Sequence, residues 1–242
     1  MQKQVSSILS EKHINKLIRA FKDEINPSAR NASFDYCYNY FQDTPNPASN
    51  KHLQISCLQL GLYLASWGMY RGSSFLLKEK SIKYYKPLIR KIAKFKKLQG
   101  IDVDGYTNEN IEEIIKCYKS IAKWVPKEKR AITLVTKIML GIFGCIPAFD
   151  DYFCESFRKL HKKNRCGFRR VNKHSLSLIK QFYDDHRDLI DRWSKKIKTI
   201  DFNTGKKTRR TYTKAKIIDM IGFQEGLQCV IKKKKNMKKK IK

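Results

Sequence analysis

Residues 53–70 read LQISCLQLGLYLASWGMY, a strongly apolar stretch with no charged side chain. Its apolar residues fall on most faces of a helix of about 3.6 residues per turn, a pattern typical of a buried helix. We therefore predict a helix from Leu53 to Tyr70 at the centre of the fold. A central helix of this kind implies a domain built from helices packed on helices.

The segments on both sides of this stretch also place apolar residues at helical spacing. Ser10, Thr107 and Thr213 stand where N-capping residues belong, and Pro147 is expected to open a helix. We predict further helices over about 11–25, 81–97, 108–124, 130–143, 147–160, 175–198 and from 214 onward, and no strand. The expected fold is all-α, a single multi-helix globular domain over 1–230 with a disordered, lysine-rich tail over 231–242.

The charge of the chain indicates the class of partner. Lys and Arg number 52 against 22 Asp and Glu, which gives a net charge of +30 on 242 residues. A field of this size attracts polyanions, and each phosphate that is neutralised releases a condensed counterion. The charge favours a nucleic-acid-binding protein over an enzyme acting on a small neutral metabolite.

Composition also bears on the compartment. The seven cysteines lie in apolar segments without a C-x-x-C pair, which indicates reduced thiols rather than a disulfide framework or a zinc site. The N-terminus lacks a signal-peptide core, and no stretch reaches the roughly 20 apolar residues of a membrane span. We expect a cytoplasmic protein with no metal and no cofactor.

The candidate nucleic-acid-binding residues lie in one predicted helix and two predicted basic loops. The helix over 81–97 is apolar on one face and basic on the other, and loops 161–173 and 205–210 are rich in Lys and Arg. In the first loop, Phe168 is expected to stack on a base between arginines that contact phosphates. The candidates are Lys83, Arg90, Lys94, Lys97, Lys162, Lys163, Arg165, Phe168, Arg169, Arg170, Lys206, Lys207, Arg209 and Arg210. The tail offers further lysines, which would also suit anionic lipid or a localisation signal.

A further candidate follows the central helix. Arg71 is a lone charge beside an apolar run, and Gly72, Ser73 and Ser74 would give a helix start with free backbone N–H groups. Such a start can hold an anion, so Arg71, Ser73 and Ser74 join the candidate phosphate contacts. The alternative is a structural corner in which Arg71 is paired internally.

The segment 136–153, TKIMLGIFGCIPAFDDYF, reads as a helix, a glycine-containing turn and a second helix. It resembles the helix-hairpin-helix DNA glycosylase superfamily, although the usual L-P-G-V-G hairpin is replaced by the spacing of Gly141 and Gly144. The resemblance implies Asp150 or Asp151 as the catalytic carboxylate and Lys137 as the amine. The alternative for Lys137 is a charge on the helix surface.

Three segments, 61–77, 133–153 and 213–226, resemble those of a family of bacterial helical proteins. The stretches that carry this resemblance are LASWGMYRGSSFLL, TKIMLGIFGCIPAFD and KAKIIDM. The resemblance extends over most of the domain and implies no particular function.

Arg169 and His174 are spaced as in the R-x(4–6)-H signature, and here the chain resembles HEPN-type RNases. That resemblance implies a metal-independent RNase in which His174 and Arg169 of two protomers act on the ribose 2′-OH. The usual polar residue after the arginine is Arg170 in this chain. Chance is the alternative, because an Arg-rich sequence produces such pairs easily.

No P-loop, Rossmann glycine pattern, H-E-x-x-H, G-x-S-x-G or C2H2 finger is present. The sequence therefore predicts a nucleic-acid-binding protein, with RNA favoured over DNA because basic loops with aromatic residues suit irregular RNA. A bacterial defence or toxin–antitoxin context would fit. The alternatives are a HEPN-like RNase, a base-excising enzyme, and a structural ribonucleoprotein subunit. A homodimer or a ribonucleoprotein partner is compatible with each of them.

Overall fold

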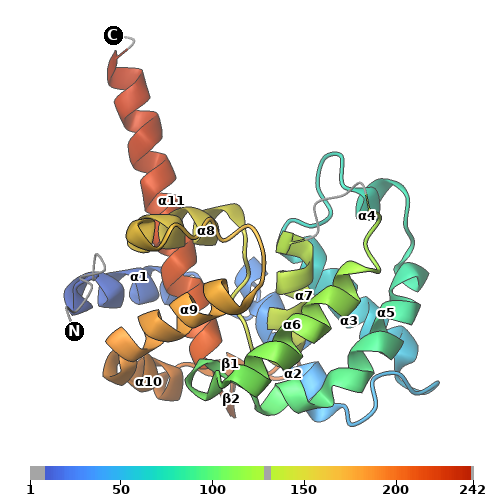
Figure 1. The fold of residues 1–242 in the computed structure, drawn as a ribbon. Coiled ribbons are helices and arrows are strands. Elements are labelled where there is room, and N and C mark those ends of the chain that lie inside the picture. The colour runs from blue at the N-terminus through green and yellow to red at the C-terminus, as the bar shows by residue number, and fades with distance from the viewer. Residues whose placement is uncertain (1–8, 128–131, 241–242) are drawn as a thin grey trace.

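A computed structural model describes residues 9–127 and 132–240. These residues form eleven α-helices and one two-stranded hairpin around a single hydrophobic core, which confirms the all-α prediction (Figure 1). The helices are α1 (Glu11–Asp23), α2 (Ser33–Asp43), α3 (Leu53–Ser66), α4 (Phe75–Lys78), α5 (Lys86–Ile92), α6 (Asn108–Ala122), α7 (Ile132–Phe143), α8 (Asp151–Leu160), α9 (Lys173–Asp185), α10 (Arg187–Lys196) and α11 (Lys214–Lys240). Residues 1–8, 130–131 and 241–242, where parts of the predictions fall, lie outside the described range.

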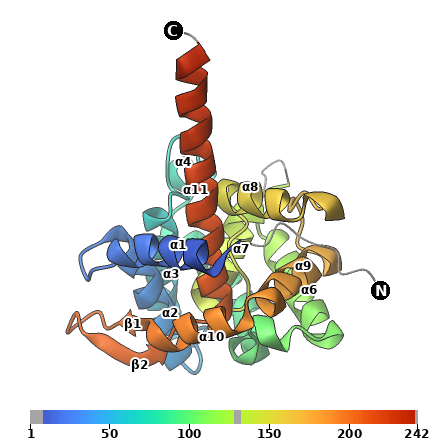
Figure 2. The ribbon, with the colours of Figure 1, turned by 90° about the vertical axis from the view of Figure 1, so that its left-hand side faces the viewer.

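Helix α11 organises one half of the molecule. Its N-terminal half is buried, α8 and α1 cross it, and its C-terminal half projects beyond the other helices (Figure 2). Helices α11 and α8 cross closely at Gly226. The approach is possible because glycine has no Cβ, which would overlap the backbone carbonyl of Tyr152. The predicted lysine-rich tail over 231–242 overlaps the last part of α11, which runs to Lys240.

Helix α7, rather than α3, is the most buried of the helices. Every residue from Leu134 to Phe143 is buried, and α7 packs on α2, α3 and α6. In α3 the residues Leu60 and Leu64 face the core, but Ile55, Leu58 and Leu62 are about half exposed or more. The expectation that the helix over 53–70 is buried on most faces is therefore wrong for the face that carries Ile55, Leu58 and Leu62. The predicted end at Tyr70 is also wrong, since α3 ends at Ser66.

Several predicted helices are interrupted. The segment 81–97 is a 3-10 turn at Ile82–Tyr85, the short α5, and a further 3-10 segment at Ala93–Gly100. Pro87 lacks an N–H and so starts a new helix instead of continuing the preceding turn. The predicted helix 175–198 is split at His186 into α9 and α10. Pro147 does not open α8, because Asp150 is its N-cap.

The prediction that the chain has no strand is wrong, because two short strands form a hairpin. Strands β1 (Lys198–Ile200) and β2 (Lys207–Thr211) pair antiparallel, with Lys198 opposite Thr211 and Ile200 opposite Lys207. The predicted basic loop 205–210 therefore lies mostly on β2. Within the described residues no helix is both long and apolar enough to cross a membrane. All seven cysteines are free thiols, five of them buried.

Candidate functional site

The hairpin is fixed to α2 by two polar side chains. Asp35 accepts the backbone N–H of Ile200 at 2.9 Å and the hydroxyl of Tyr212 at 2.7 Å. One helical turn later, Asn39 donates to the carbonyl of Ile200 at 3.0 Å and accepts from Thr199 at 2.8 Å. Helical spacing puts Asp35 and Asn39 on the same face of α2, so both ends of the hairpin are held.

Asp35 is fully buried, and its protonation is altered as a result. Burial raises the pKa of this carboxyl from 3.8 to about 7, while the hydrogen bonds from Tyr212 and Ile200 and the ammonium of Lys216 act in the opposite direction. Desolvation prevails because transfer of a carboxylate out of water costs more than these hydrogen bonds return. The carboxyl that anchors the hairpin therefore titrates near neutral pH.

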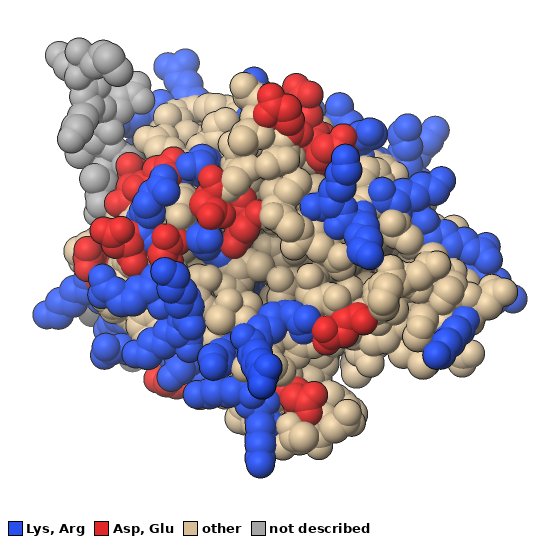
Figure 3. Space-filling view, turned by 90° about the horizontal axis from the view of Figure 1, so that it is seen from below, with Lys and Arg blue, Asp and Glu red and all other residues tan. Residues whose placement is uncertain are grey.

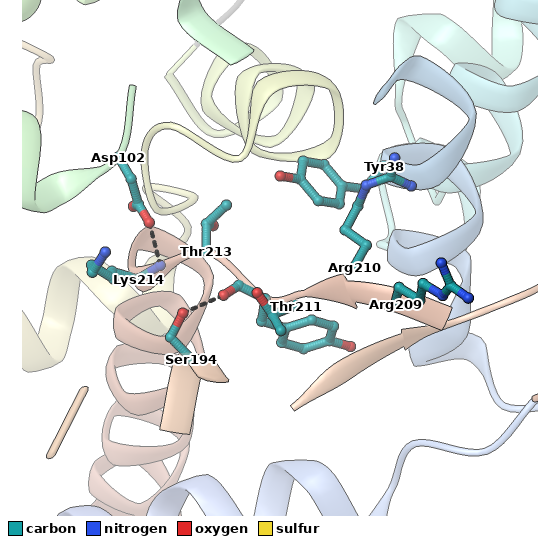
Figure 4. A pocket seen from close by; sticks show the side chains of 9 residues that line it. Tyr38, Asp102, Ser194, Arg209, Arg210, Thr211, Thr213 and Lys214 are labelled. Atoms are coloured by element: carbon teal, nitrogen blue, oxygen red, sulfur yellow. Dashed lines mark hydrogen bonds between the residues drawn. The ribbon is translucent and has the colours of Figure 1, made fainter. Parts of the chain in front are cut away.

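An open hollow of about 570 Å³ lies between the hairpin and the start of α11. Figure 4 shows Tyr38 of α2, Arg209 and Arg210 of β2, and Thr213 and Lys214 at the start of α11 around it. Ser194, Thr211, Tyr212 and Asp102 complete the lining. The lining thus combines three cationic side chains with hydroxyl groups, which are donors suited to phosphate oxygens.

The helix start beside this hollow is already occupied by a carboxylate. Asp102 accepts the backbone N–H groups of Lys214 and Ala215 at 2.6 and 2.9 Å. A negative charge at a helix N-terminus is favourable, so Asp102 takes the place that an external anion would otherwise take. Burial raises the pKa of Asp102, and the backbone N–H groups oppose that shift. An anionic ligand in the hollow must therefore be bound by side chains.

The three cations of the hollow differ in how far they are neutralised. Arg210 pairs with Asp43 at 2.7 Å, and Lys214 pairs with Asp104 at 2.9 Å. Arg209 is exposed and has no carboxylate partner within the described range. Strand alternation explains this difference, since Arg210 points toward α2 while Lys207 and Arg209 point to solvent.

Most of the predicted phosphate-binding cations resemble Arg209 in being exposed and unpaired with a carboxylate of the described residues. They are exposed and form no ion pair in the part of the chain that the structure describes: Arg71, Lys83, Arg90, Lys94, Lys97, Lys162, Arg165, Arg169, Arg170, Lys206, Lys207 and Arg209. Lys163 is also exposed. They are not confined to one face, because α5 and the hairpin lie at different sides of the molecule (Figure 1). Seen from below, Lys and Arg side chains are spread over the face, with several groups of acidic side chains among them (Figure 3).

One of the predicted ligand contacts is wrong. Phe168 is 1% exposed and packs between Phe149, Phe153 and Phe157, so it cannot stack on a base. An aromatic ring with apolar neighbours within reach gains more by burial than in a solvated loop. The predicted helix start after 72–74 is present but short, because α4 has only four residues, and its N-cap Ser74 donates its hydroxyl to the carbonyl of Met69. Ser73 is exposed on this corner.

Arg169 and His174 lie at the junction of a loop and α9, as the sequence predicts. Both are exposed, and Asn172 caps the helix between them with a capping box to Ser175. The Nε2 atom of His174 is 3.1 Å from the carbonyl oxygen of Asn164, which requires a proton on that nitrogen. Among the residues that the structure describes, no carboxylate contacts the imidazole of His174, and neither side chain of the pair is buried.

A second polar cluster is buried between α3, α7, α8 and α11. Lys137 Nζ lies 3.5 Å from Asp150 Oδ2, and Lys216 Nζ lies 2.8 Å from Asp219 Oδ2. Each of these four side chains is at most 14% exposed. The expectation that Lys137 is a helix-surface charge is therefore wrong, whereas Asp151 is exposed.

Aromatic rings enclose the two ammonium groups of this cluster. Lys137 Nζ is 5.1 Å and Lys216 Nζ 4.9 Å from the ring centre of Trp67, and Lys216 also lies over Phe21 and Phe34. The Nε1–H of Trp67 is buried without a hydrogen-bond partner. The remaining cavity is about 10 Å³, enough for about one water.

Burial changes the charge balance of the Lys137–Asp150 pair. It lowers the pKa of Lys137 and raises the pKa of Asp150, and in each case the partner's charge acts in the opposite direction. Asp150 also caps α8 through the N–H of Phe153 at 3.0 Å. The three sequence segments 61–77, 133–153 and 213–226 meet at this cluster.

Some residues of these sites were not among the predicted ones. Tyr38, Thr211, Thr213 and Lys214 line the hollow, and Lys216 and Asp219 complete the buried cluster. Lys216 and Asp219 stand in the quoted segment KAKIIDM, where charges among buried positions of a helix were the available signal. In the described residues no group of three or more His, Cys, Asp or Glu side chains is arranged to hold a metal ion.

Comparison of the chain with protein-family models, with curated proteins and with solved structures found no match.

Proposed function

We propose that this protein binds nucleic acid, with RNA preferred over DNA, through its β-hairpin, the adjoining hollow and the exposed cations around them. The observation that carries the proposal is the set of exposed cations without carboxylate partners, of which Lys206, Lys207 and Arg209 lie together on the hairpin. Cations that are not neutralised within the protein gain most from a phosphate backbone, because binding releases its condensed counterions.

The shape of the site supports a polymer rather than a small metabolite. The hollow is open, and its cations continue along β2 onto the hairpin turn instead of converging on one point. Guanidinium groups bind phosphate in a bidentate manner and position a backbone without reading sequence. The preference for RNA rests on two points: the sequence shows no recognition-helix module, and the exposed ring of Phe202 lies on the hairpin turn that carries these cations.

The test is to purify the protein from its host without nuclease and to measure the ratio of absorbance at 260 and 280 nm. Sequencing of the co-eluting nucleic acid follows. One RNA species retained at moderate salt supports specific RNA binding, and a mixture lost steeply with salt supports non-specific backbone binding. Protein free of nucleic acid that also fails to shift added RNA would contradict the proposal.

Base excision is the second candidate, and the buried contact of Lys137 with Asp150 is the observation that favours it. A lowered pKa gives Lys137 a larger uncharged fraction, and a neutral amine can add to the aldehyde carbon of an abasic sugar, with loss of water, to form an imine. The cavity holds about one water, so Trp67 would have to move first.

Borohydride trapping tests this candidate. With DNA that contains an abasic site, the native protein should form a covalent adduct that Lys137→Met loses and that the control Lys12→Met, an exposed lysine on α1, keeps. If the native protein gives no adduct, or if Lys137→Met gives as much as the native protein, base excision through Lys137 is excluded.

A further inference from the structure

The hairpin turn carries an exposed aromatic ring. Phe202 is 70% exposed, the largest exposure among the large hydrophobic residues that the structure describes as exposed. Single exposed apolar residues are common on protein surfaces, so exposure alone identifies no site. The geometry and the charges around this ring decide its role.

The ring of Phe202 has one aromatic neighbour, and the contact leaves room for another. Phe202 and Tyr36 of α2 meet edge to face, with ring centres 5.1 Å apart and planes 87° apart. In such a pair Tyr36 covers at most one face of Phe202. The hydroxyl of Tyr36 donates to the carbonyl of Pro27 at 2.6 Å, which fixes the tyrosine ring in its place. At least one face of Phe202 is thus open to a planar ligand.

Hydrogen bonds within the turn hold Phe202 in place. Asp201 accepts from the backbone N–H and the hydroxyl of Thr204, both at 2.8 Å, and its own N–H donates to the carbonyl of Lys206 at 2.8 Å. Gly205 adopts φ of +65°, a conformation that L side chains rarely take. Asp35 and Asn39 hold the strand before the turn. A ring on a fixed turn loses little entropy when a ligand stacks on it.

Cations border the ring on both sides along the chain. Lys198 precedes it on β1, and Lys206, Lys207 and Arg209 follow it, all of them exposed. The one nearby acid on the turn, Asp201, is engaged by Thr204. An open aromatic face beside unpaired cations is the combination that binds unpaired nucleotides, in which bases stack and phosphates are neutralised.

We infer that Phe202 is a stacking platform for a base and that the ligand of the hairpin is single-stranded nucleic acid. This inference rests on the proposed function and makes it more specific, because a duplex keeps its bases stacked on one another and out of reach of Phe202. The strand would pass from Phe202 along the cations of β2 toward the hollow at the start of α11.

The experiment measures fluorescence anisotropy of a labelled RNA of about 12 nucleotides, alone and annealed to its complement, with four proteins. These are the native chain, Phe202→Ala, Phe202→Trp and the control Leu77→Ala, whose exposed side chain lies on α4. Loss of one stacked base should weaken single-strand binding of Phe202→Ala by about 5- to 100-fold. Duplex binding should stay within about twofold, and Phe202→Trp and Leu77→Ala should bind the single strand like the native protein.

Single-strand affinity of Phe202→Ala equal to that of the native chain would overturn the stacking role and leave the proposed function intact. Equal losses for single strand and duplex would also overturn it, since stacking discriminates between the two. Failure of the native chain to bind either RNA would instead overturn the proposed function itself.

Discussion

Asp35 and Tyr212 lie 2.7 Å apart in the core, and their hydrogen bond ties α2 to the residue that follows β2. The same carboxyl accepts the N–H of Ile200 at the end of β1. One buried acid therefore holds both strands of the hairpin, and the position of the basic surface depends on it.

Asp35→Asn should change how stability depends on pH. The folded protein keeps the proton on Asp35 up to about pH 7, whereas the unfolded chain loses it near 3.8. The folded state binds more protons between these values, so the contribution of Asp35 to stability is present at low pH and is lost as the pH rises toward 7. A shift of this size corresponds to roughly 4 kcal/mol at most.

The measurement is the free energy of unfolding by urea at several pH values from about 4 to about 8, for the native chain and for Asp35→Asn. The native curve should fall with rising pH more steeply than the curve of the variant. Parallel curves would show that Asp35 does not titrate in this range.

Lys137→Met should destabilise the fold more than the double change Lys137→Met with Asp150→Asn. Removal of the lysine leaves a buried carboxylate without its cation, a loss of about 3–5 kcal/mol, while the double variant leaves no such charge. Asn at position 150 keeps an oxygen that can cap α8. Urea unfolding of the two single variants and the double variant gives the coupling energy, and additive losses would contradict a direct interaction.

The destabilisation by Lys137→Met should also be smaller at acid pH. Burial already raises the pKa of Asp150, so the carboxyl without its cation becomes neutral more readily as the pH falls. A loss of stability that is independent of pH between about 4 and about 8 would contradict this account.

Gly226→Ala should weaken the packing of α8 on α11. The added methyl group would meet the backbone carbonyl of Tyr152, which cannot move aside as a flexible side chain could, and overpacking of this kind costs about 1–3 kcal/mol. Gly100→Ala is the matched control, because no atom lies within 4 Å of the position of its Cβ. Thermal unfolding should show a lower midpoint for Gly226→Ala and an unchanged or higher one for Gly100→Ala. A midpoint for Gly226→Ala above that for Gly100→Ala would contradict the close crossing of α8 and α11.

The sequence predicted the helices well where apolar spacing and capping residues agreed. The predicted caps Ser10 and Thr107 cap α1 and α6 in the structure, and both helices lie where their patterns place them. The predicted cap Thr213 accepts the N–H of Lys216 at the start of α11. The hairpin could not be predicted in this way, because K-T-R-R-T is short and charged and has no apolar alternation. Its stability comes from Asp35 and Asn39, which are more than 150 residues away in the chain.

In the candidate site, too, the residues marked by local charge could be predicted, and those whose burial depends on tertiary packing could not. The exposed lysines and arginines of segment 81–97 and loop 161–173 were evident from local charge, since nothing in the fold covers them. Phe168 is buried by the packing of its loop on α8, and Lys137 by Trp67 from a distant segment, and the sequence alone gives no information about either contact. Phe202 was missed because a lone aromatic residue in a turn becomes a candidate only when the cations of β2 are placed beside it.

The central claim is that unpaired cations of the hairpin bind a nucleic-acid backbone, and the salt dependence of RNA binding tests it most directly. The affinity for single-stranded RNA is measured from about 50 to about 400 mM NaCl for the native chain, for Lys207→Glu with Arg209→Glu, and for the control Lys12→Glu with Lys16→Glu, which makes the same charge change on α1. The logarithm of the affinity should fall linearly with the logarithm of the salt concentration. The slope should be shallower by about 0.7 for each lost phosphate contact in the hairpin variant only. Equal slopes for the hairpin variant and the native chain, or no binding by the native chain at the lowest salt, would contradict the claim.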